Sequence, residues 1–206
     1  MSAPSPRLLK QACDALAERD ACLAHAYQTV GLPTWRATAP TYQALARIVV
    51  YQLISTKAAD VIWGRIQDRL ESVTAEAVLR DNQEALRACG LSRPKLGHLN
   101  AIAEAVRSGA LDLNAMREQP ITDARRALLA IKGIGPWTAD TFLMTALGHL
   151  DAFPSGDVGL IEAYRQLDGA DARLTAKAFT AAADSWRPYR AVAAHLLYDW
   201  YNSTRR

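Results

Sequence analysis

The chain has 206 residues, of which 50% are apolar and 22% charged, and its formal net charge is +3. This length allows one sizeable core or two small lobes. Without a run of 18 apolar residues, the composition excludes a membrane span. The first residues lack the apolar core of a signal peptide, so we expect a cytoplasmic protein. The small net charge is only a weak pointer to nucleic acid.

Cysteine usage narrows the class of protein further. Cys13, Cys22 and Cys89 are odd in number and widely spaced. This argues against a disulfide framework and against a zinc or iron–sulfur site. We expect three buried thiols.

The apolar pattern predicts helices throughout and almost no β-structure. Ser55, Thr74, Ser92 and Thr122 are expected N-caps, and residues 81–84 resemble a capping box. The expected helices cover residues 8–29, 42–54, 55–70, a short stretch after 74, 81–90, 92–109, 123–130, 136–148, 156–167, 175–183 and 188–201.

The most informative segment is IKGIGPWT, residues 131–138. Two glycines flank one apolar residue, and a proline suited to the first turn of a helix follows, so the segment predicts a tight hairpin between two helices. The first N–H groups of the second helix lack partners within it and can hold a phosphate. A lone acid, Asp157, follows about one helix and one loop later. From spacing alone, Asp157 either caps a helix or carries chemistry.

Several signatures in order resemble one family. They are YQLISTKAAD, GLSRPK, IKGIGPWTAD with AFPSGDVGL, and SWRPYRAVAAHLLY, and they span about residues 42–200. Together they resemble the helix-hairpin-helix superfamily of DNA glycosylases, and in particular its AlkA-type branch, 3-methyladenine DNA glycosylase II.

The resemblance implies an all-α fold of two helical lobes with a cleft between them. Lobe one is expected to comprise about residues 1–40 plus 150–206, and lobe two about 41–149 with the hairpin at 123–147. The residues before the first signature are predicted to be helical. We therefore expect the minimal form of the glycosylase, without the N-terminal β-domain of some relatives.

By this resemblance Asp157 is the catalytic carboxylate. Breaking an N-glycosidic bond develops oxocarbenium character on the sugar, which a carboxylate stabilises while it orients or deprotonates the water. An alkylated purine already carries positive charge, so one carboxylate suffices. Asp140 and Asp151 are rival acids, which we interpret as solvated or capping groups.

Aromatic residues are expected to bind the base. Trp137 stands where bifunctional relatives carry a lysine nucleophile, and since a tryptophan cannot form a Schiff base, the resemblance implies a monofunctional enzyme. Its indole would stack on the cationic base. Tyr198 aligns with a second stacking aromatic, with Trp200 and Tyr201 as alternatives, and core packing is the other interpretation of all these rings. Thr141 is expected to shape the pocket.

The remaining expected contacts are with duplex DNA. Leu53 is the expected wedge that fills the gap left by the extruded nucleotide, with a buried leucine at a helix end as the alternative. Backbone carbonyls of Ile131 and Ile134 are expected to hold Na⁺ or K⁺ when DNA is bound, and no other cofactor is expected. The further expected DNA contacts are Gln52, Ser55, Lys132, Gly133, Ile134, Gly135 and Thr138. Basic residues expected to add salt-dependent affinity are Lys57, Arg93, Lys95, Arg187 and Arg190.

The resemblance therefore implies a monomeric glycosylase that releases alkylated bases, such as 3-methyladenine and 7-methylguanine, from double-stranded DNA. A glycosylase for oxidised or mismatched bases is one alternative, against which the absent lysine and absent cluster cysteines argue. A non-catalytic DNA-binding hairpin module is another.

Overall fold

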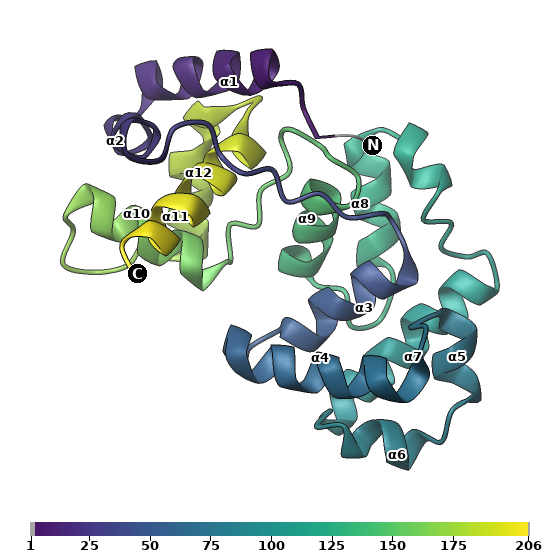
Figure 1. Cartoon of the computed structure of the whole chain (residues 1–206). Coiled ribbons are helices and arrows are strands. Elements are labelled where there is room, and N and C mark those ends of the chain that lie inside the picture. The colour runs from purple at the N-terminus through teal and green to yellow at the C-terminus, as the bar shows by residue number, and fades with distance from the viewer. Residues whose placement is uncertain (1–2, 206) are drawn as a thin grey trace. The chain divides into compact units, whose positions relative to one another are not determined.

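The computed structural model describes residues 3–205, and all regular structure within that range is helical (Figure 1). The expected all-α fold is therefore confirmed. The chain divides into two compact units, residues 1–37 with 148–206 (unit 1) and residues 38–147 (unit 2). Among the described residues, no helix has both the length and the apolar character that crossing a membrane requires.

Unit 1 is built around its last helix, α12. Residues 191–197 of that helix are all buried, and the helix packs against α2 and α10. An aromatic cluster of Phe153, Tyr164, Phe179 and Trp186 fills the neighbouring core, with ring centroids 5.2 to 5.8 Å apart. The elements of unit 1 are α1 (Pro6–Arg19), α2 (Ala21–Val30), α10 (Val158–Asp168), α11 (Ala176–Ala182), the 3₁₀ turn η2 (Ala183–Trp186) and α12 (Arg190–Ser203).

The expected single helix over residues 8–29 is wrong, because Asp20 divides it into α1 and α2. Asp20 has an extended backbone, and its Oδ1 accepts hydrogen bonds from the N–H groups of Cys22 and Leu23, which caps α2. Its Oδ2 accepts from Tyr164 Oη at 3.2 Å and Trp186 Nε1 at 2.9 Å. Four bonds on one carboxylate hold the break in place.

Unit 2 gathers the middle helices around α3 and α7. Helix α3 packs against α7 and α9, α5 packs against α7, and α8 packs against α9. The apolar stripe expected on the 92–109 helix is buried at Leu96, Leu99, Ile102 and Ala103. The elements of unit 2 are α3 (Tyr42–Tyr51), α4 (Thr56–Leu70), α5 (Ala75–Arg80), α6 (Gln83–Ala88), α7 (Arg93–Arg107), the 3₁₀ turn η1 (Ala115–Glu118), α8 (Ile121–Leu129) and α9 (Pro136–Thr145).

Three of the expected N-caps are confirmed, since the side chains of Ser55, Thr74 and Ser92 each accept a hydrogen bond from the helix that follows. Two expectations are wrong. Pro120 occupies the N-cap position of α8, so Thr122 lies inside its first turn.

The expected capping box at 81–84 is also replaced by a different arrangement. Asn82 caps α6 by accepting from the N–H groups of Glu84 and Ala85. Asp81 instead pairs with Arg69. The three expected buried thiols are confirmed.

Candidate active site and nucleic-acid interface

Asp157 occupies the N-cap position of α10 in unit 1. Its Oδ1 accepts a hydrogen bond from the Leu160 N–H at 3.0 Å. The capping interpretation is therefore correct, but it does not exclude chemistry, because an ionised carboxylate has about four lone-pair positions and the cap uses one. The cap also places the carboxylate at the positive end of the helix dipole.

Tyr198 of α12 lies close enough to this carboxylate for its pKa to respond to the charge of Asp157. Burial of the phenol and the nearby negative charge of Asp157 raise the pKa of Tyr198 well above 10, while Arg36 acts in the opposite direction. Tyr198 therefore remains protonated. The two residues that the sequence assigned to catalysis and to base stacking in unit 1 are thus brought together.

Arg36 is a residue that sequence reasoning missed. Its guanidinium carbon lies 5.6 Å from the centroid of the Tyr198 ring. Its Nη2 donates to Asp199 Oδ1 at 2.5 Å, and the Thr34 N–H donates to Asp199 Oδ2 at 2.6 Å. Asp199 thereby fastens the segment after α2 to α12. No local signal in the sequence pairs residue 36 with residue 199.

The alternatives to Tyr198 lie in different surroundings. Trp200 is buried, which fits the core-packing interpretation of that residue. The guanidinium carbon of Arg205 lies 4.7 Å from the ring centroid of Tyr201.

The rival acids are neither solvated nor capping groups, so that interpretation is corrected. Asp140 is buried and receives Arg125 Nε at 2.6 Å and Nη2 at 3.1 Å. Asp151 receives Arg187 Nη1 at 2.6 Å and Arg190 Nε at 2.8 Å. Each acid is neutralised by arginine, and in this structure Arg187 and Arg190 bind Asp151 rather than presenting open charges to a phosphate.

The hairpin glycines of unit 2 differ in what they do. Gly133 has a φ of +93°, and a Cβ built on it would lie 2.3 Å from Cγ of His98. The fold therefore requires glycine at 133. A Cβ on Gly135 meets nothing within 4 Å, and its φ of −89° suits any residue. Neither conformation nor packing within the chain explains the second glycine.

Helix α9 begins at Pro136, directly after the hairpin, as expected. Trp137 is half-buried in its first turn, and Thr141 lies one turn further along the same helix. The Thr141 Oγ1 atom is buried and has no hydrogen-bond partner in the structure. The Thr138 side chain is buried, so a contact between Thr138 and DNA would have to use its backbone N–H.

The loop between α3 and α4 is bound to the hairpin. Gln52 Nε2 donates to the Gly133 carbonyl at 3.2 Å and to Thr138 Oγ1 at 2.7 Å. Lys95 Nζ donates to the Val50 carbonyl at 2.6 Å, and burial lowers the pKa of Lys95. Lys95 therefore caps α3, which corrects its expected role at a phosphate. The Lys95–Val50 hydrogen bond lies at the last turn of α3. This helix ends at Tyr51, three residues before the expected end.

Leu53 is the most exposed large apolar side chain of this loop. Its exposure is 102%, which excludes the alternative of a leucine buried at a helix end. Its φ of +58° is unusual for a residue with a Cβ and costs about 1–2 kcal/mol. Ser55, two residues later, is exposed and caps α4. An apolar side chain held in water by a strained backbone suggests a binding role.

The expected ion ligands and basic residues are placed as follows. The Ile131 carbonyl accepts the Ile134 N–H at 3.1 Å, which leaves it one lone pair for an ion. The Ile134 side chain is buried, so only its backbone is available. Lys57, Arg93 and Lys132 are exposed.

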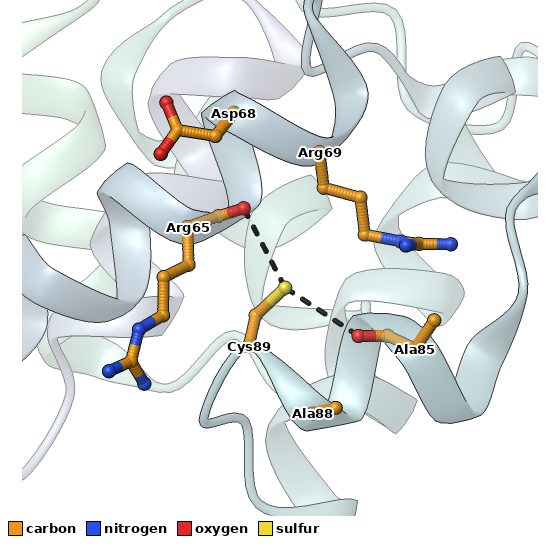
Figure 2. Close-up of a pocket in the computed structure, with 6 residues that line it drawn as sticks. All are labelled: Arg65, Asp68, Arg69, Ala85, Ala88 and Cys89. Atoms are coloured by element: carbon orange, nitrogen blue, oxygen red, sulfur yellow. Dashed lines mark hydrogen bonds between the residues drawn. The ribbon is translucent and has the colours of Figure 1, made fainter.

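A separate open hollow lies between α4 and α6. It is lined by Arg65, Asp68, Arg69, Ala85, Ala88 and Cys89, as Figure 2 shows. The Cys89 thiol bonds the carbonyls of Arg65 and Ala85 at 3.7 and 3.6 Å, and burial raises its pKa. A protonated, hydrogen-bonded thiol is a poor nucleophile, so we assign this hollow no chemistry.

Comparison with known proteins places the chain in a family. Residues 46–188 match the model of the HhH-GPD superfamily base excision DNA repair protein. The chain is 31% identical to DNA-3-methyladenine glycosylase 1 of Schizosaccharomyces pombe over 161 residues, covering 76% of this chain and 71% of that protein.

Two solved structures are similar along nearly the whole chain. The 3-methyladenine DNA glycosylase Mag1 of S. pombe, solved in complex with abasic DNA, has a TM-score of 0.83 and 28% identity and covers 94% of this chain and 97% of that one. A DNA-3-methyladenine glycosidase of Bacillus halodurans has a TM-score of 0.77 and 31% identity and covers 100% of this chain and 93% of that one. The chain therefore belongs to the HhH-GPD superfamily of base excision DNA repair proteins, among the 3-methyladenine DNA glycosylases.

Proposed function

We propose that this protein is a monofunctional DNA glycosylase that hydrolyses the N-glycosidic bond of alkylated bases in double-stranded DNA and leaves an abasic site. The observation that carries the proposal is the Asp157 carboxylate, held at the N-terminus of α10 by the Leu160 N–H, with Tyr198 nearby. The family and the names of the similar glycosylases support the choice of substrate.

The chemistry follows from the charge that develops on the sugar. As the bond to the base lengthens, positive charge accumulates at C1′ and the ring oxygen, and a fixed carboxylate stabilises it. A base alkylated at N3 or N7 leaves as a neutral molecule, so protonation by the enzyme is not needed. Asp157 then accepts a proton from the water that attacks C1′.

Trp137 supports the absence of lyase activity. In the bifunctional relatives a lysine at this position attacks the sugar, and an indole has no nucleophilic nitrogen with which to form a Schiff base. Its electron-rich face instead suits a cationic base. In a borohydride trapping experiment with damaged duplex DNA, we expect no covalent protein–DNA product. A trapped product would contradict this part of the proposal.

Unit 2 would make the contacts with the DNA backbone and with the gap in the base stack. Backbone N–H groups at the start of α9, beside Gly135, would bind phosphate, and Leu53 would occupy the space of the extruded nucleotide. We propose that the backbone carbonyls of Ile131 and Ile134 would hold Na⁺ or K⁺, whose positive charge would favour binding of the phosphate. Affinity for abasic DNA should then differ between KCl and tetramethylammonium chloride at equal ionic strength. Sedimentation of the complex should give one protein chain per lesion.

A single-turnover assay tests the whole proposal. Duplex DNA containing 7-methylguanine or 3-methyladenine is incubated with excess wild type or with Asp157→Asn, and the free base is measured. We expect base release by the wild type and a loss of about 10³-fold or more in the variant, with abasic-DNA affinity retained. Equal release by both proteins would overturn the role of Asp157. Tight binding to abasic DNA without release by either would instead indicate a binding module.

A further inference from the structure

We propose that Lys95 is a positioning residue, whose ammonium group ends α3 and thereby keeps Leu53 exposed, in position to enter duplex DNA. This inference rests on the proposed function, since it concerns the side chain assigned to the gap in the base stack. Lys95 itself would touch neither the base nor the DNA backbone.

The apolar pattern of α3 favours a longer helix than the structure has. Leu45, Val49 and Val50 belong to its buried face. Leu53 lies four residues after Val49 and three after Val50, so one further helical turn would place it on that face. The structure instead gives Leu53 a φ of +58° and leaves its side chain fully exposed. Hydrophobic burial and backbone strain both oppose this conformation, so other contacts must hold it.

Lys95 supplies a hydrogen bond that a longer α3 would make within itself. In a continued helix the Val50 carbonyl would accept the N–H of Ile54. In the structure this carbonyl accepts Lys95 Nζ at 2.6 Å. Val50 is buried, and a buried carbonyl without a partner is costly, so the ammonium group replaces the bond that the longer helix would supply. A cation is also favourable at the negative end of the helix dipole.

Helix α7 positions Lys95 for this role. It packs against α3, and the Lys95 side chain at its N-terminal end is half-buried. Burial lowers the pKa of Lys95, because the ammonium group has partly left bulk water and depends on a partner within the protein. The bond to the Val50 carbonyl therefore stabilises the short form of α3.

The residue after α3 is restrained as well. Gln52 follows the last residue of the helix, and its side-chain amide donates to the Gly133 carbonyl and to Thr138 Oγ1. Lys95 thus acts on the last turn of α3 and Gln52 on the first residue beyond it. Removing the ammonium group should allow α3 to lengthen and Leu53 to move to the buried face.

Thiol labelling of Leu53→Cys measures the exposure of residue 53 without an assay of activity. The native cysteines Cys13, Cys22 and Cys89 are buried, so the introduced thiol should react much faster with an aromatic disulfide reagent. Lys95→Met removes the ammonium group and keeps an apolar stem. Labelling should be at least about fivefold slower when this change is added to Leu53→Cys. Adding Lys95→Arg, which keeps a cationic donor, should leave labelling within about twofold of Leu53→Cys alone.

Base release with Leu53 in place tests the consequence for DNA. In Lys95→Met, single-turnover release from duplex relative to single-stranded substrate should fall at least about fivefold, because only the duplex has to be opened. The salt dependence of affinity for abasic DNA should equal that of the wild type, since the ammonium group binds a carbonyl and no phosphate. Lys10→Met is the control, because it removes a lysine that pairs with Asp14 on α1. It should match the wild type in both measurements.

The contrary results are distinguishable. Labelling that Lys95→Met leaves unchanged would overturn the inference, and equally slow labelling with Lys95→Arg would do so too, because the effect would not depend on a cationic donor. A salt dependence reduced by about one phosphate contact would show that Lys95 binds DNA directly, and would also overturn it. Failure of the wild type to release any base would refute the proposed function, whereas the labelling would still test the position of residue 53. Circular dichroism melts establish that each variant is folded, and Lys95→Leu takes the place of Lys95→Met if that variant is not.

Discussion

The side-chain amide of Gln52 donates a hydrogen bond to the Thr138 hydroxyl at 2.7 Å, and thereby joins the loop that carries Leu53 to the first turn of α9. The same amide nitrogen reaches the Gly133 carbonyl. The loop with the exposed leucine and the glycine hairpin are therefore joined by hydrogen bonds within unit 2.

Replacing Thr138 with valine should weaken this connection. The variant keeps the shape of the side chain and removes the acceptor for Gln52, which should cost about 1 kcal/mol of unfolding free energy and weaken abasic-DNA binding several-fold. The matched control is Thr145→Val, which removes another hydroxyl of α9, one that donates to the Thr141 carbonyl at 2.8 Å. Urea unfolding and fluorescence anisotropy measure the two quantities. Unchanged DNA affinity in Thr138→Val would show that the link is not needed for binding.

Replacing each hairpin glycine with alanine should affect stability and DNA binding differently. Gly133→Ala places a Cβ 2.3 Å from His98 at a positive φ, so we expect a loss of about 3 kcal/mol or more in stability. Gly135→Ala has open space and should change stability by less than about 0.5 kcal/mol. If a phosphate approaches that backbone, Gly135→Ala should nevertheless weaken DNA binding about tenfold. If this variant binds DNA with wild-type affinity, the phosphate does not approach the backbone at Gly135.

Leu53→Gly should separate stability from activity. Glycine relieves the positive φ, so the free energy of unfolding should change by only about 1 kcal/mol, while base release from duplex DNA should fall at least about tenfold. Val61→Ala removes another exposed apolar side chain, on α4, and serves as control. The wedge role predicts a smaller defect on single-stranded substrate, because no stack has to be opened there. Equal defects on both substrates would argue against it.

Gly159→Ala tests how much room the Asp157 carboxylate needs. A Cβ at residue 159 would lie 3.1 Å from Asp157 Oδ1, tight enough to displace it. Alanine should stabilise α10 by up to about 1 kcal/mol, yet single-turnover base release should slow. A Cβ on Gly64, in α4, would meet nothing within 4 Å. Gly64→Ala should therefore give a similar gain in stability without slowing base release. Two variants with the same rate would mean that the carboxylate tolerates the contact.

His195 should make the fold sensitive to mild acid. It is fully buried, its two ring nitrogens have no hydrogen-bond partner, and burial lowers its pKa from 6.5 to about 3. Below pH 6.5, His195 becomes protonated in the unfolded chain but stays neutral in the native state. The free energy of unfolding should therefore decrease as the pH is lowered through this range. From pH 6.5 to 5 the loss should reach about 2 kcal/mol.

Urea unfolding of His195→Leu at pH 7 and pH 5 measures this effect. The variant should lose less stability over the interval than the wild type, and His25→Leu, at an exposed histidine of α2, should behave as wild type. The same pH dependence in wild type and His195→Leu would assign the sensitivity to other groups.

Local chemistry explains which features the sequence could predict. The caps at Ser55, Thr74 and Ser92 and the start of α9 at Pro136 depend on residues within one turn of each other, so their patterns were sufficient. The break at Asp20 was missed because Trp186 and Tyr164, its fixing partners, are far away in the sequence.

The same limit applies to the candidate site. The resemblance indicates Asp157 and Tyr198 separately, but the two residues lie near each other only because α12 packs on α10. Arg36 and Lys95 look like ordinary surface cations until their partners, Asp199 and the Val50 carbonyl, are placed. Contacts between residues far apart in the sequence depend on how the helices pack, and the apolar periodicity of the sequence does not predict them.

The division of the chain also sets an order for folding during synthesis. Unit 2 is one uninterrupted stretch, and the Thr38 N–H donates to the Thr145 carbonyl at 2.9 Å, so its two ends are fastened to each other. Unit 1 needs α1 and α2 as well as α10 and α12, which are synthesised after unit 2. Unit 2 can therefore complete its core during synthesis, whereas the apolar faces of α1 and α2 stay uncovered until α10 and α12 have also been synthesised.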